Sequence, residues 1–157
     1  MSTNVTDKTL VAGGLSIMGL ITARGGSKGI PGKNLIPIRG RPLISYTIEA
    51  ALESKVLDRV IVSTDDTKIA EVSREYGAET PFARPAHLSG DWDPSYPVVV
   101  HALQWMAENE GYFPDYIMLM QPTSPLRIAE DIRNAVTLAR EKDADGVISV
   151  YEPKQHP

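Results

Sequence analysis

The 157-residue sequence contains no cysteine. This absence excludes a disulfide scaffold, thiolate catalysis, a cysteine-ligated zinc site and an iron–sulfur cluster. A domain of this length buries about 70% of the surface that its unfolded chain exposes, so its core needs no disulfide or metal to hold it together. The lack of cysteine also suits a reducing compartment, and we expect a cytoplasmic protein.

The sequence also lacks a hydrophobic run long enough to span a membrane. Its longest uncharged run covers residues 9–23, and these 15 residues fall short of the about 20 that a transmembrane helix needs. We therefore expect no membrane partner. Residues 1–15 are polar and then glycine-rich, which predicts a flexible tail or leader, and residues 16–157 are predicted to form one domain.

An excess of basic residues is missing as well, since 16 Lys and Arg stand against 20 Asp and Glu, for a net charge of −4. A protein that binds nucleic acid in general is usually basic, so we expect no nucleic-acid partner. Within this acidic chain, residues 24–41 carry a charge of +5 and no acidic residue. Such a positive island predicts either a small anionic ligand or a solvated basic loop.

Short apolar runs alternate with amphipathic segments along the chain. The predicted strands are residues 15–23, 59–64, 116–120 and 146–151, with a possible short strand at 78–82. The predicted helices are residues 42–54, 66–76, 98–109 and 128–142. Because the strands are continuous apolar runs separated by helices, the sequence predicts an α/β fold of three layers, a mostly parallel sheet with helices on both faces.

In a parallel sheet the loops that follow the strands share one edge, and ligands bind there. The candidate loops are residues 24–34, 64–66 and 121–127. The loop at 84–97 contains three prolines after Arg84 and has the length to reach the same edge. Loops of that length are more often functional than structural.

The strongest local signal is the glycine-rich loop after the first predicted strand, ARGGSKGIPGKN at residues 23–34. Its glycines let the backbone come close to a ligand, and successive N–H groups can form an anion-binding concavity. Arg24, Lys28 and Lys33 can neutralise several phosphate charges. The loop is therefore predicted to bind the linked phosphates of a nucleoside triphosphate, with a structural turn as the alternative.

Two well-known glycine motifs are excluded for this loop. A P-loop requires glycine where Ser27 stands and a hydroxyl residue where Asn34 stands. The dinucleotide fingerprint requires glycine in place of Arg24, and Pro31 prevents a regular helix from running through the segment. The loop must hold phosphates in a third way.

The loop ARGGSKGIPGKN, the segment IVSTDD and the segment QPTSPLR together resemble the CMP-N-acylneuraminate synthetases, or acylneuraminate cytidylyltransferases, from about Met18 to Pro157. The resemblance implies a Rossmann-like, GT-A-like nucleotidyltransferase. It would transfer CMP from CTP to a nine-carbon 2-keto sugar acid of the sialic type, giving CMP-sugar and pyrophosphate. The related CMP-Kdo synthetases carry an acidic residue where this chain has Pro122-Thr123.

The resemblance also implies roles for single residues. The implied nucleotide-binding residues are Arg24, Gly25, Gly26, Ser27, Lys28, Lys33, Asn34, Arg84, Asp93 and Ser95, of which Arg24 and Lys33 would also act in catalysis. A carboxylate would repel CTP, so Asp93 is expected to offer a backbone contact. The implied sugar-acid residues are Gln121, Thr123, Ser124 and Arg127, where Arg127 either pairs with the sugar carboxylate or braces the helix that follows.

Members of this family continue well beyond the length of this chain. The resemblance implies that the further part supplies a dimer-forming segment, an arginine near the reaction and two aspartates that hold Mg²⁺. We therefore assign no metal ligand here, and expect Mg²⁺ as cofactor, a homodimer at full length and no turnover by the 157 residues alone. Asp65 and Asp66 are expected to cap a helix, with a metal role as the alternative. Other readings stay open, namely another sugar nucleotidyltransferase or a nucleotide-binding fragment without catalysis.

Overall fold

The computed structural model describes residues 14–27, 29–90 and 95–150. The predicted tail therefore lies outside the described residues except for Gly14 and Leu15, which are both exposed. Within the described ranges, no helix is long and apolar enough to cross a lipid bilayer.

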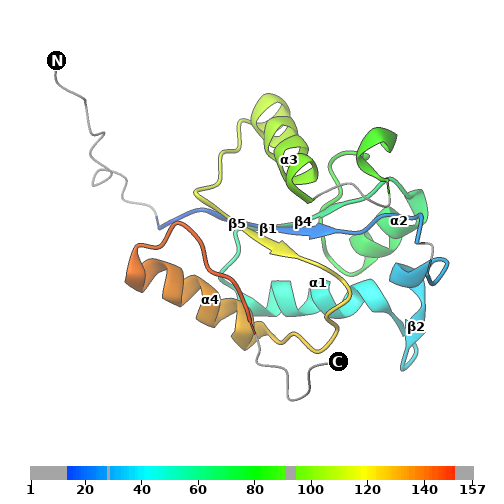
Figure 1. The fold of residues 1–157 in the computed structure, drawn as a ribbon, viewed down its shortest axis with the longest axis horizontal. Coiled ribbons are helices and arrows are strands. Elements are labelled where there is room, and N and C mark those ends of the chain that lie inside the picture. The colour runs from blue at the N-terminus through cyan, green and yellow to red at the C-terminus, as the bar shows by residue number, and fades with distance from the viewer. Residues whose placement is uncertain (1–13, 28, 91–94, 151–157) are drawn as a thin grey trace.

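Three parallel strands form the central sheet, in the order β4-β1-β5 (Figure 1). They are β1 (Ile17–Thr22), β4 (Arg59–Ser63) and β5 (Tyr116–Met120). β1 lies in the middle, with Leu20 opposite Ile61 of β4 on one side and opposite Leu119 of β5 on the other. Because the strands are parallel, their carboxyl ends meet at one edge of the sheet.

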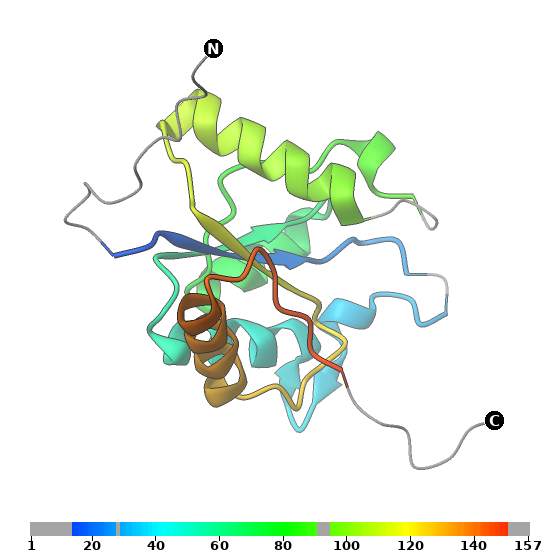
Figure 2. The ribbon, with the colours of Figure 1, turned by 60° about the vertical axis from the view of Figure 1, so that its left-hand side comes forward.

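Helices cover both faces of this sheet, and this confirms the predicted three-layer α/β fold. They are α1 (Leu43–Ser54), α2 (Thr67–Glu75), α3 (Ser95–Glu110) and α4 (Ala129–Lys142). In both ribbon views, α3 lies on one side of the strands while α1 and α4 lie on the other (Figures 1 and 2).

Each face of the sheet has its own hydrophobic core. Ile48 of α1, Ile69 of α2 and Ile132 of α4 share one core with Ile21 of β1. On the opposite face, Met18 and Leu20 of β1 share a core with Phe82 and with Ala102 and Met106 of α3. Neighbouring residues of a strand point to opposite faces, so a strand covered on both sides must be apolar throughout. Burying each of these large side chains stabilises the fold by about 1.5–3 kcal/mol.

The ends of the helices follow local signals in the sequence. Asp66 caps α2, because its Oδ1 atom accepts a hydrogen bond from the Ile69 N–H (2.9 Å). Gly77, with φ of 91°, ends the same helix, as predicted. The helix α3 begins three residues earlier than the prediction, at Ser95, because Pro97 fits the first turn, where a backbone N–H has no helical partner.

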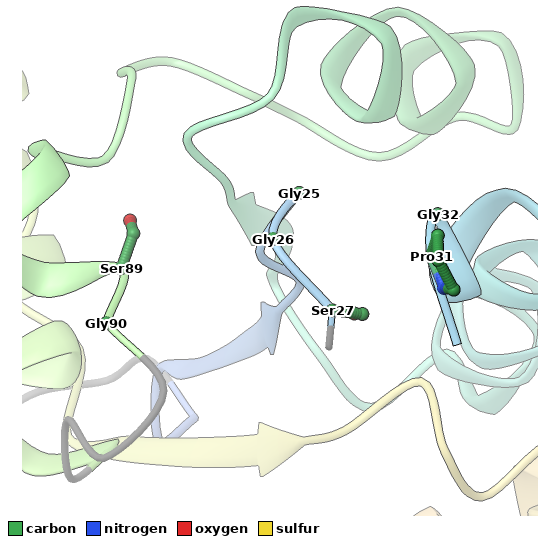
Figure 3. A pocket seen from close by; sticks show the side chains of 7 residues that line it. All are labelled: Gly25, Gly26, Ser27, Pro31, Gly32, Ser89 and Gly90. Atoms are coloured by element: carbon green, nitrogen blue, oxygen red, sulfur yellow. The ribbon is translucent and has the colours of Figure 1, made fainter. Parts of the chain in front are cut away.

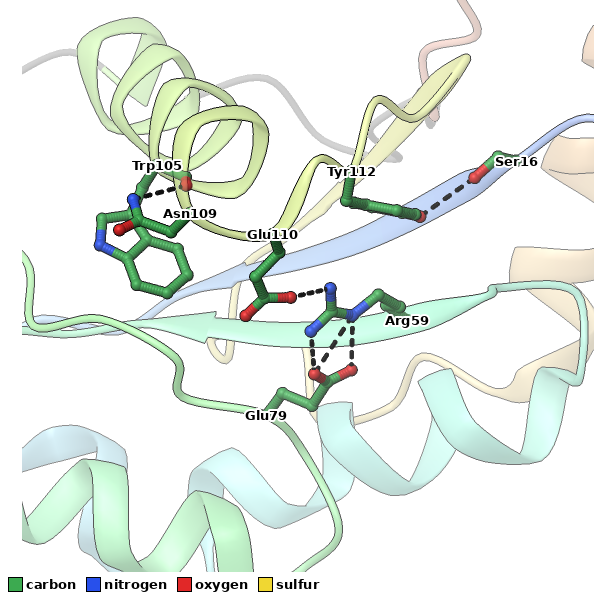
Figure 4. Close-up of polar contacts among 7 residues, drawn as sticks. All are labelled: Ser16, Arg59, Glu79, Trp105, Asn109, Glu110 and Tyr112. Carbon is green, nitrogen blue, oxygen red and sulfur yellow. Dashed lines mark hydrogen bonds and ion pairs between the residues drawn. The ribbon is translucent and has the colours of Figure 1, made fainter.

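At the amino end of the sheet, Arg59 joins three segments (Figure 4). Its guanidinium forms ion pairs with Glu79 and with Glu110 at the end of α3. It also lies over the ring of Tyr112, 5.2 Å from the ring centre. These carboxylates raise the pKa of Arg59. The cluster joins these segments at the end of the sheet opposite to the carboxyl ends of the strands.

Two strand predictions are wrong. Residues 146–150 form no strand, because their apolar side chains find no cover: Ile148 is 84% exposed and Val150 87%. Tyr151, the last residue of that predicted strand, lies outside the described residues. The possible strand at 78–82 is reduced to a single parallel bridge between Ile61 and Glu79.

The prediction also missed a small hairpin between the glycine-rich loop and α1. Its strands are β2 (Pro37–Ile38) and β3 (Arg41–Pro42). The two residues between them, Arg39 and Gly40, have φ of 49° and 83°, the sign pattern of the type I′ turn that suits two-residue hairpins. Hairpin strands of two residues are too short to show an alternating pattern in the sequence.

Candidate functional site

The glycine-rich loop leaves β1 at the edge where the strands end. The N–H of Ala23 donates to the carbonyl oxygen of Ser63 (3.0 Å), so the loop departs in register with the end of β4. Two residues further along the loop, the N–H of Gly25 donates to a side chain, the Oδ1 atom of Asp65 (3.0 Å). Two of the predicted loops, 24–34 and 64–66, therefore meet directly.

Glycine is required at position 25 because the loop passes close to Asp66. A Cβ atom at this position would lie 2.8 Å from Oδ2 and 2.9 Å from Cβ of Asp66. At Gly26 a Cβ atom would meet nothing within 4 Å. Gly25 therefore allows the loop to pass close to the start of α2. At Gly26 the surrounding space would accommodate a side chain.

The loop returns to the body through a short helix. Gly32, with φ of 64°, begins the 3₁₀-helix η1 (Lys33–Leu35). Asn34 is 5% exposed, and its amide nitrogen donates to the carbonyl oxygen of Arg24 (3.0 Å). Asn34 thus ties the two ends of the loop together. The asparagine that replaces the hydroxyl residue of a P-loop is a brace of the loop itself.

The loop opens on a hollow of about 440 Å³, which we call the first hollow. It is lined by Gly25, Gly26, Ser27, Pro31, Gly32, Ser89 and Gly90. In Figure 3 the segment 25–27 lies between residues 89–90 on one side and residues 31–32 on the other. Backbone groups and small side chains dominate this lining, which lets a ligand approach the main chain closely.

A second hollow of about 270 Å³ adjoins the first, since Ser27 and Gly90 line both. Its lining comes from the end of β1, from the loops at 24–34, 84–90 and 121–127, and from α3. The residues are Thr22, Arg24, Ser27, Lys33, Asn34, Arg84, Leu88, Gly90, Ser95, Val98, Gln121, Pro122 and Thr123. Three of these residues are cationic and none is acidic. A concave surface of one sign of charge concentrates ligands of the opposite sign, here an anion.

Arg84 is held firmly at the end of β4. It is 6% exposed, its Nε donates to Oγ of Ser63 (3.1 Å), and a terminal nitrogen donates to the Ser63 carbonyl. Burial and the positive charge of Arg24 lower the pKa of Arg84, while Asp65 raises it. An arginine stays charged under these conditions. The second hollow therefore contains a fixed positive charge on one wall.

The third loop, residues 121–127, folds back on itself beyond β5. The Arg127 N–H donates to the Ser124 carbonyl (3.1 Å), and the Arg127 side chain donates to the Gln121 carbonyl (3.4 Å). Burial lowers the pKa of Arg127, which Asp131 partly offsets. Of the two roles predicted for Arg127, the structure contains the bracing contact at the start of α4. Its pairing with a sugar carboxylate stays a prediction.

Most residues of the predicted site come together at these two hollows. Gly25, Gly26 and Ser27 line the first; Arg24, Ser27, Lys33, Asn34, Arg84, Ser95, Gln121 and Thr123 line the second. Ser124 and Arg127 line neither. Lys28 and Asp93 lie outside the described residues. The roles of all these residues in binding stay predictions.

Sequence reasoning missed several lining residues. They are Thr22, Pro31, Leu88, Ser89, Gly90, Val98 and Pro122, whereas Gly32 is one of the loop glycines predicted to let the backbone approach a ligand. Thr22 and Pro122 are adjacent to predicted loop residues, so their place at a strand end was a usable signal. Leu88 and Val98 carry no polar group and could be placed only once the course of the chain between Arg84 and α3 was known.

The described residues do not fit a magnesium site. No group of three or more His, Asp or Glu in the described ranges is arranged to hold a metal ion. Asp65 and Asp66 are the carboxylates that contact the loop, and both are engaged, with the N–H groups of Gly25 and Ile69. This arrangement confirms that Asp66 is a helix cap, and it gives Asp65 a contact that the prediction did not include.

A parallel α/β sheet with a glycine-rich, cationic concavity at the carboxyl ends of its strands is typical of α/β domains that bind phosphate-bearing ligands. Comparison with known proteins agrees with this class. Residues 18–155 match the family model described as "Cytidylyltransferase". The chain belongs to this family.

The curated relatives include several enzymes that make CMP-activated sugar acids. The chain is 41% identical over 124 residues to the CMP-N,N'-diacetyllegionaminic acid synthase of Legionella pneumophila, covering 79% of this chain and 53% of that protein. It is 44% identical over 117 residues to the pseudaminic acid cytidylyltransferase of Campylobacter jejuni, covering 74% and 50%. The N-acylneuraminate cytidylyltransferase of Escherichia coli is 39% identical over 78% of this chain and 28% of that protein. The chain thus spans about half or less of these relatives.

Among solved structures, the CMP-2-keto-3-deoxy-manno-octonic acid synthetase complexed with CTP is similar to this chain, with a TM-score of 0.67 and 26% identity. The match covers 82% of this chain and 49% of that one. These comparisons confirm the resemblance to the cytidylyltransferases. The homodimer and the cytoplasmic location stay predictions.

The two loop glycines differ enough to give a matched test. Gly25→Ala should lower the free energy of unfolding by about 1–3 kcal/mol, the usual cost of forcing an extra carbon into a packed position, because it drives a Cβ atom into Asp66. Gly26→Ala should leave that free energy unchanged within about 0.5 kcal/mol. Urea denaturation followed by circular dichroism measures both. Equal stability of the two variants would contradict the close approach at Gly25.

His101 predicts how stability depends on pH. Its Nδ1 atom is buried with no hydrogen-bond partner among the described residues, and its ring packs against Phe82 with 5.0 Å between ring centres. Burial, with the charges of Arg84 and His87, lowers the pKa of His101 below its usual value of about 6.5.

The unfolded chain takes up a proton at His101 near pH 6.5, whereas the folded chain does so only at lower pH. Keeping His101 neutral therefore costs the folded chain nothing above pH 6.5. As the pH falls below that value, the unfolded chain gains a proton that the folded chain does not, and the free energy of unfolding decreases. The free energy of unfolding should fall between pH 7 and pH 5, and it should fall less in His101→Gln. An identical pH dependence in the two proteins would show that His101 contributes nothing.

Proposed function

We propose that this chain forms the nucleotide-binding part of an enzyme that transfers CMP from CTP to a nine-carbon 2-keto sugar acid, giving CMP-sugar and pyrophosphate. The observation that carries the proposal is the second hollow, where Arg24, Lys33 and Arg84 converge with no acidic residue in the lining. Three cations on one concave surface suit a ligand with several linked negative charges, as the triphosphate of CTP has. The names of the relatives supply the base and the class of sugar.

The two hollows divide the ligand between them in this proposal. The triphosphate lies against the glycine-rich backbone of the first hollow and the cations of the second. Gln121 and Thr123 line the second hollow at the end of β5, on the far side of β1 from Arg84. That wall offers amide and hydroxyl groups, which can hydrogen-bond the hydroxyl and acylamino groups of a sugar acid. The nucleotide and the sugar acid would thus meet over the end of β1.

In the proposed reaction, the anomeric hydroxyl oxygen of the sugar acid attacks the α-phosphorus of CTP. The bond from that phosphorus to the bridging oxygen breaks, the hydroxyl proton is released to solvent or a base, and pyrophosphate leaves. Arg24 and Lys33 stabilise the negative charge that grows on the phosphate oxygens, which is how proteins speed such displacements. Arg84, which Ser63 holds in place, adds a third positive charge to the second hollow.

A magnesium ion would neutralise further phosphate charge in such a reaction. The described residues offer it no ligand set. We propose that the ligands belong to the part of the relatives that this chain does not span, since the chain covers 53% of the Legionella pneumophila protein and less of the others quoted.

Two single substitutions test the nucleotide site. Arg24→Ala and Lys33→Ala should each weaken CTP binding at least tenfold, because each removes a charged contact with the triphosphate worth about 1.5–3 kcal/mol. Binding is followed by NMR titration of the isotope-labelled chain with CTP and Mg²⁺, a method that suits weak binding.

Arg39→Ala is the matched control for this pair. It removes the same charge from the same basic segment, but Arg39 lies in the exposed turn between β2 and β3 and lines neither hollow. Its affinity for CTP should stay within about twofold of the unaltered chain. If Arg24→Ala and Lys33→Ala bind CTP like this control, the loop assignment is wrong. Tighter binding of UTP, GTP or ATP than of CTP would favour a different sugar nucleotidyltransferase.

A further prediction of the proposed function concerns turnover. Residues 1–157 alone should release no pyrophosphate from CTP and a nine-carbon sugar acid above background, because the described residues hold no magnesium ligands. Joining them to the carboxy-terminal half of the Legionella pneumophila relative should restore release. A pyrophosphate-release assay in millimolar Mg²⁺ measures both. Normal turnover by the 157 residues alone would overturn the prediction.

A further inference from the structure

Asp65 makes a direct contact with the backbone of the glycine-rich loop. Its Oδ1 atom accepts a hydrogen bond from the N–H of Gly25 at 3.0 Å. The partners are 40 residues apart in sequence and belong to the loops that follow β4 and β1. The neighbouring Asp66 instead caps α2, where its Oδ1 atom accepts a hydrogen bond from the Ile69 N–H. The two consecutive aspartates therefore serve different parts of the molecule.

The Gly25 N–H is the first backbone donor of the glycine-rich loop after the strand register ends at Ala23. Two further contacts hold the same stretch: the Ser27 N–H donates to the Gly25 carbonyl (3.0 Å), and the Asn34 amide donates to the Arg24 carbonyl (3.0 Å). Asp65 supplies the contact from outside the loop. Together with the contact of Ala23, it ties the segment that bears Arg24 to the end of β4 and the loop that follows it.

The charge of Asp65 bears on the same place. It raises the pKa of buried Arg84, while the charge of Arg24 lowers it. Asp65 therefore offsets the repulsion between two arginines that line the second hollow. Asp65 would therefore affect an anionic ligand in two opposite ways. Its hydrogen bond would favour binding by holding the loop in place, and its negative charge would disfavour binding by repelling the ligand.

We propose that Asp65 is a positioning residue for nucleotide binding, which holds Gly25 through the hydrogen bond to its N–H and so sets the direction in which Arg24 leaves the sheet. The proposal rests on the proposed function, because it assumes that the loop binds CTP. It assigns the hydrogen bond, and not the negative charge, as the useful property of Asp65.

Asparagine and alanine separate these two properties. Asp65→Asn keeps an oxygen that can accept from the Gly25 N–H and removes the charge, whereas Asp65→Ala removes both. Asp65→Ala should weaken CTP binding about tenfold. Asp65→Asn should bind CTP at least as tightly as the unaltered chain, since it retains the hydrogen bond and loses the repulsion. Glu71→Gln, which removes one negative charge from an exposed position on α2, is the control for charge alone and should stay within about twofold.

The contact itself can be followed without any nucleotide. In the NMR spectrum of the chain without CTP, the Gly25 amide proton should move upfield in Asp65→Ala, because it loses its acceptor, and should stay close to its original position in Asp65→Asn. This readout does not depend on the proposed function. Thermal unfolding of all three variants checks that a change in affinity is not a loss of folded protein.

The outcomes are distinguishable. If Asp65→Ala binds CTP as tightly as the unaltered chain, or if Asp65→Asn binds as weakly as Asp65→Ala, the positioning role is wrong. If Arg24→Ala and Lys33→Ala also leave CTP binding unchanged, the proposed function fails, and the Gly25 amide shift alone then decides whether Asp65 orders the loop.

Discussion

The site depends on one backbone carbonyl, that of Ser63 at the end of β4. It accepts a hydrogen bond from the Ala23 N–H and a second from the guanidinium of Arg84. The first contact starts the glycine-rich loop, and the second brings the chain after residue 83 back to the same edge. A carbonyl has two lone pairs, and both are used here by segments far apart in sequence. Ser63 is itself fully buried, so the meeting point is rigid.

This junction explains how an acidic protein presents a cationic concavity. Arg84 is buried because its donors reach Ser63, and the cost of burying the charge is offset by hydrogen bonds and by nearby Asp65. Arg24 follows directly from the strand that pairs with β4. Lys33 is brought back by the turn at Gly32. The cations therefore converge through backbone geometry, and none of the described residues that line the two hollows is acidic.

Much of this arrangement could be predicted from the sequence, because the signals are local. Continuous apolar runs gave β1, β4 and β5, and parallel strands bring their following loops to one edge. The contact of Asp65 with Gly25 could not be predicted, since both aspartates of the pair are equally good helix caps and only the path of the loop decides between them. The strand expected at 146–150 failed for a similar reason. Its apolar pattern was right for a buried strand, but burial is a property of what covers the segment, and Ile148 and Val150 remain exposed.

The two sides of the site differ in how deeply their residues are buried. On the nucleotide side, Asn34, Ser63 and Arg84 are buried and joined by hydrogen bonds. On the side assigned to the sugar acid, Gln121 and Thr123 are exposed, and Leu119 of the neighbouring strand is 42% exposed. Pockets for small molecules usually bury most of the ligand surface, and the exposed residues Gln121 and Thr123 offer little such burial. Under the proposed function, the loops around β1 and β4 would hold the phosphates, whereas choice among sugar acids would need surfaces beyond those that β5 and its loop provide in the described residues.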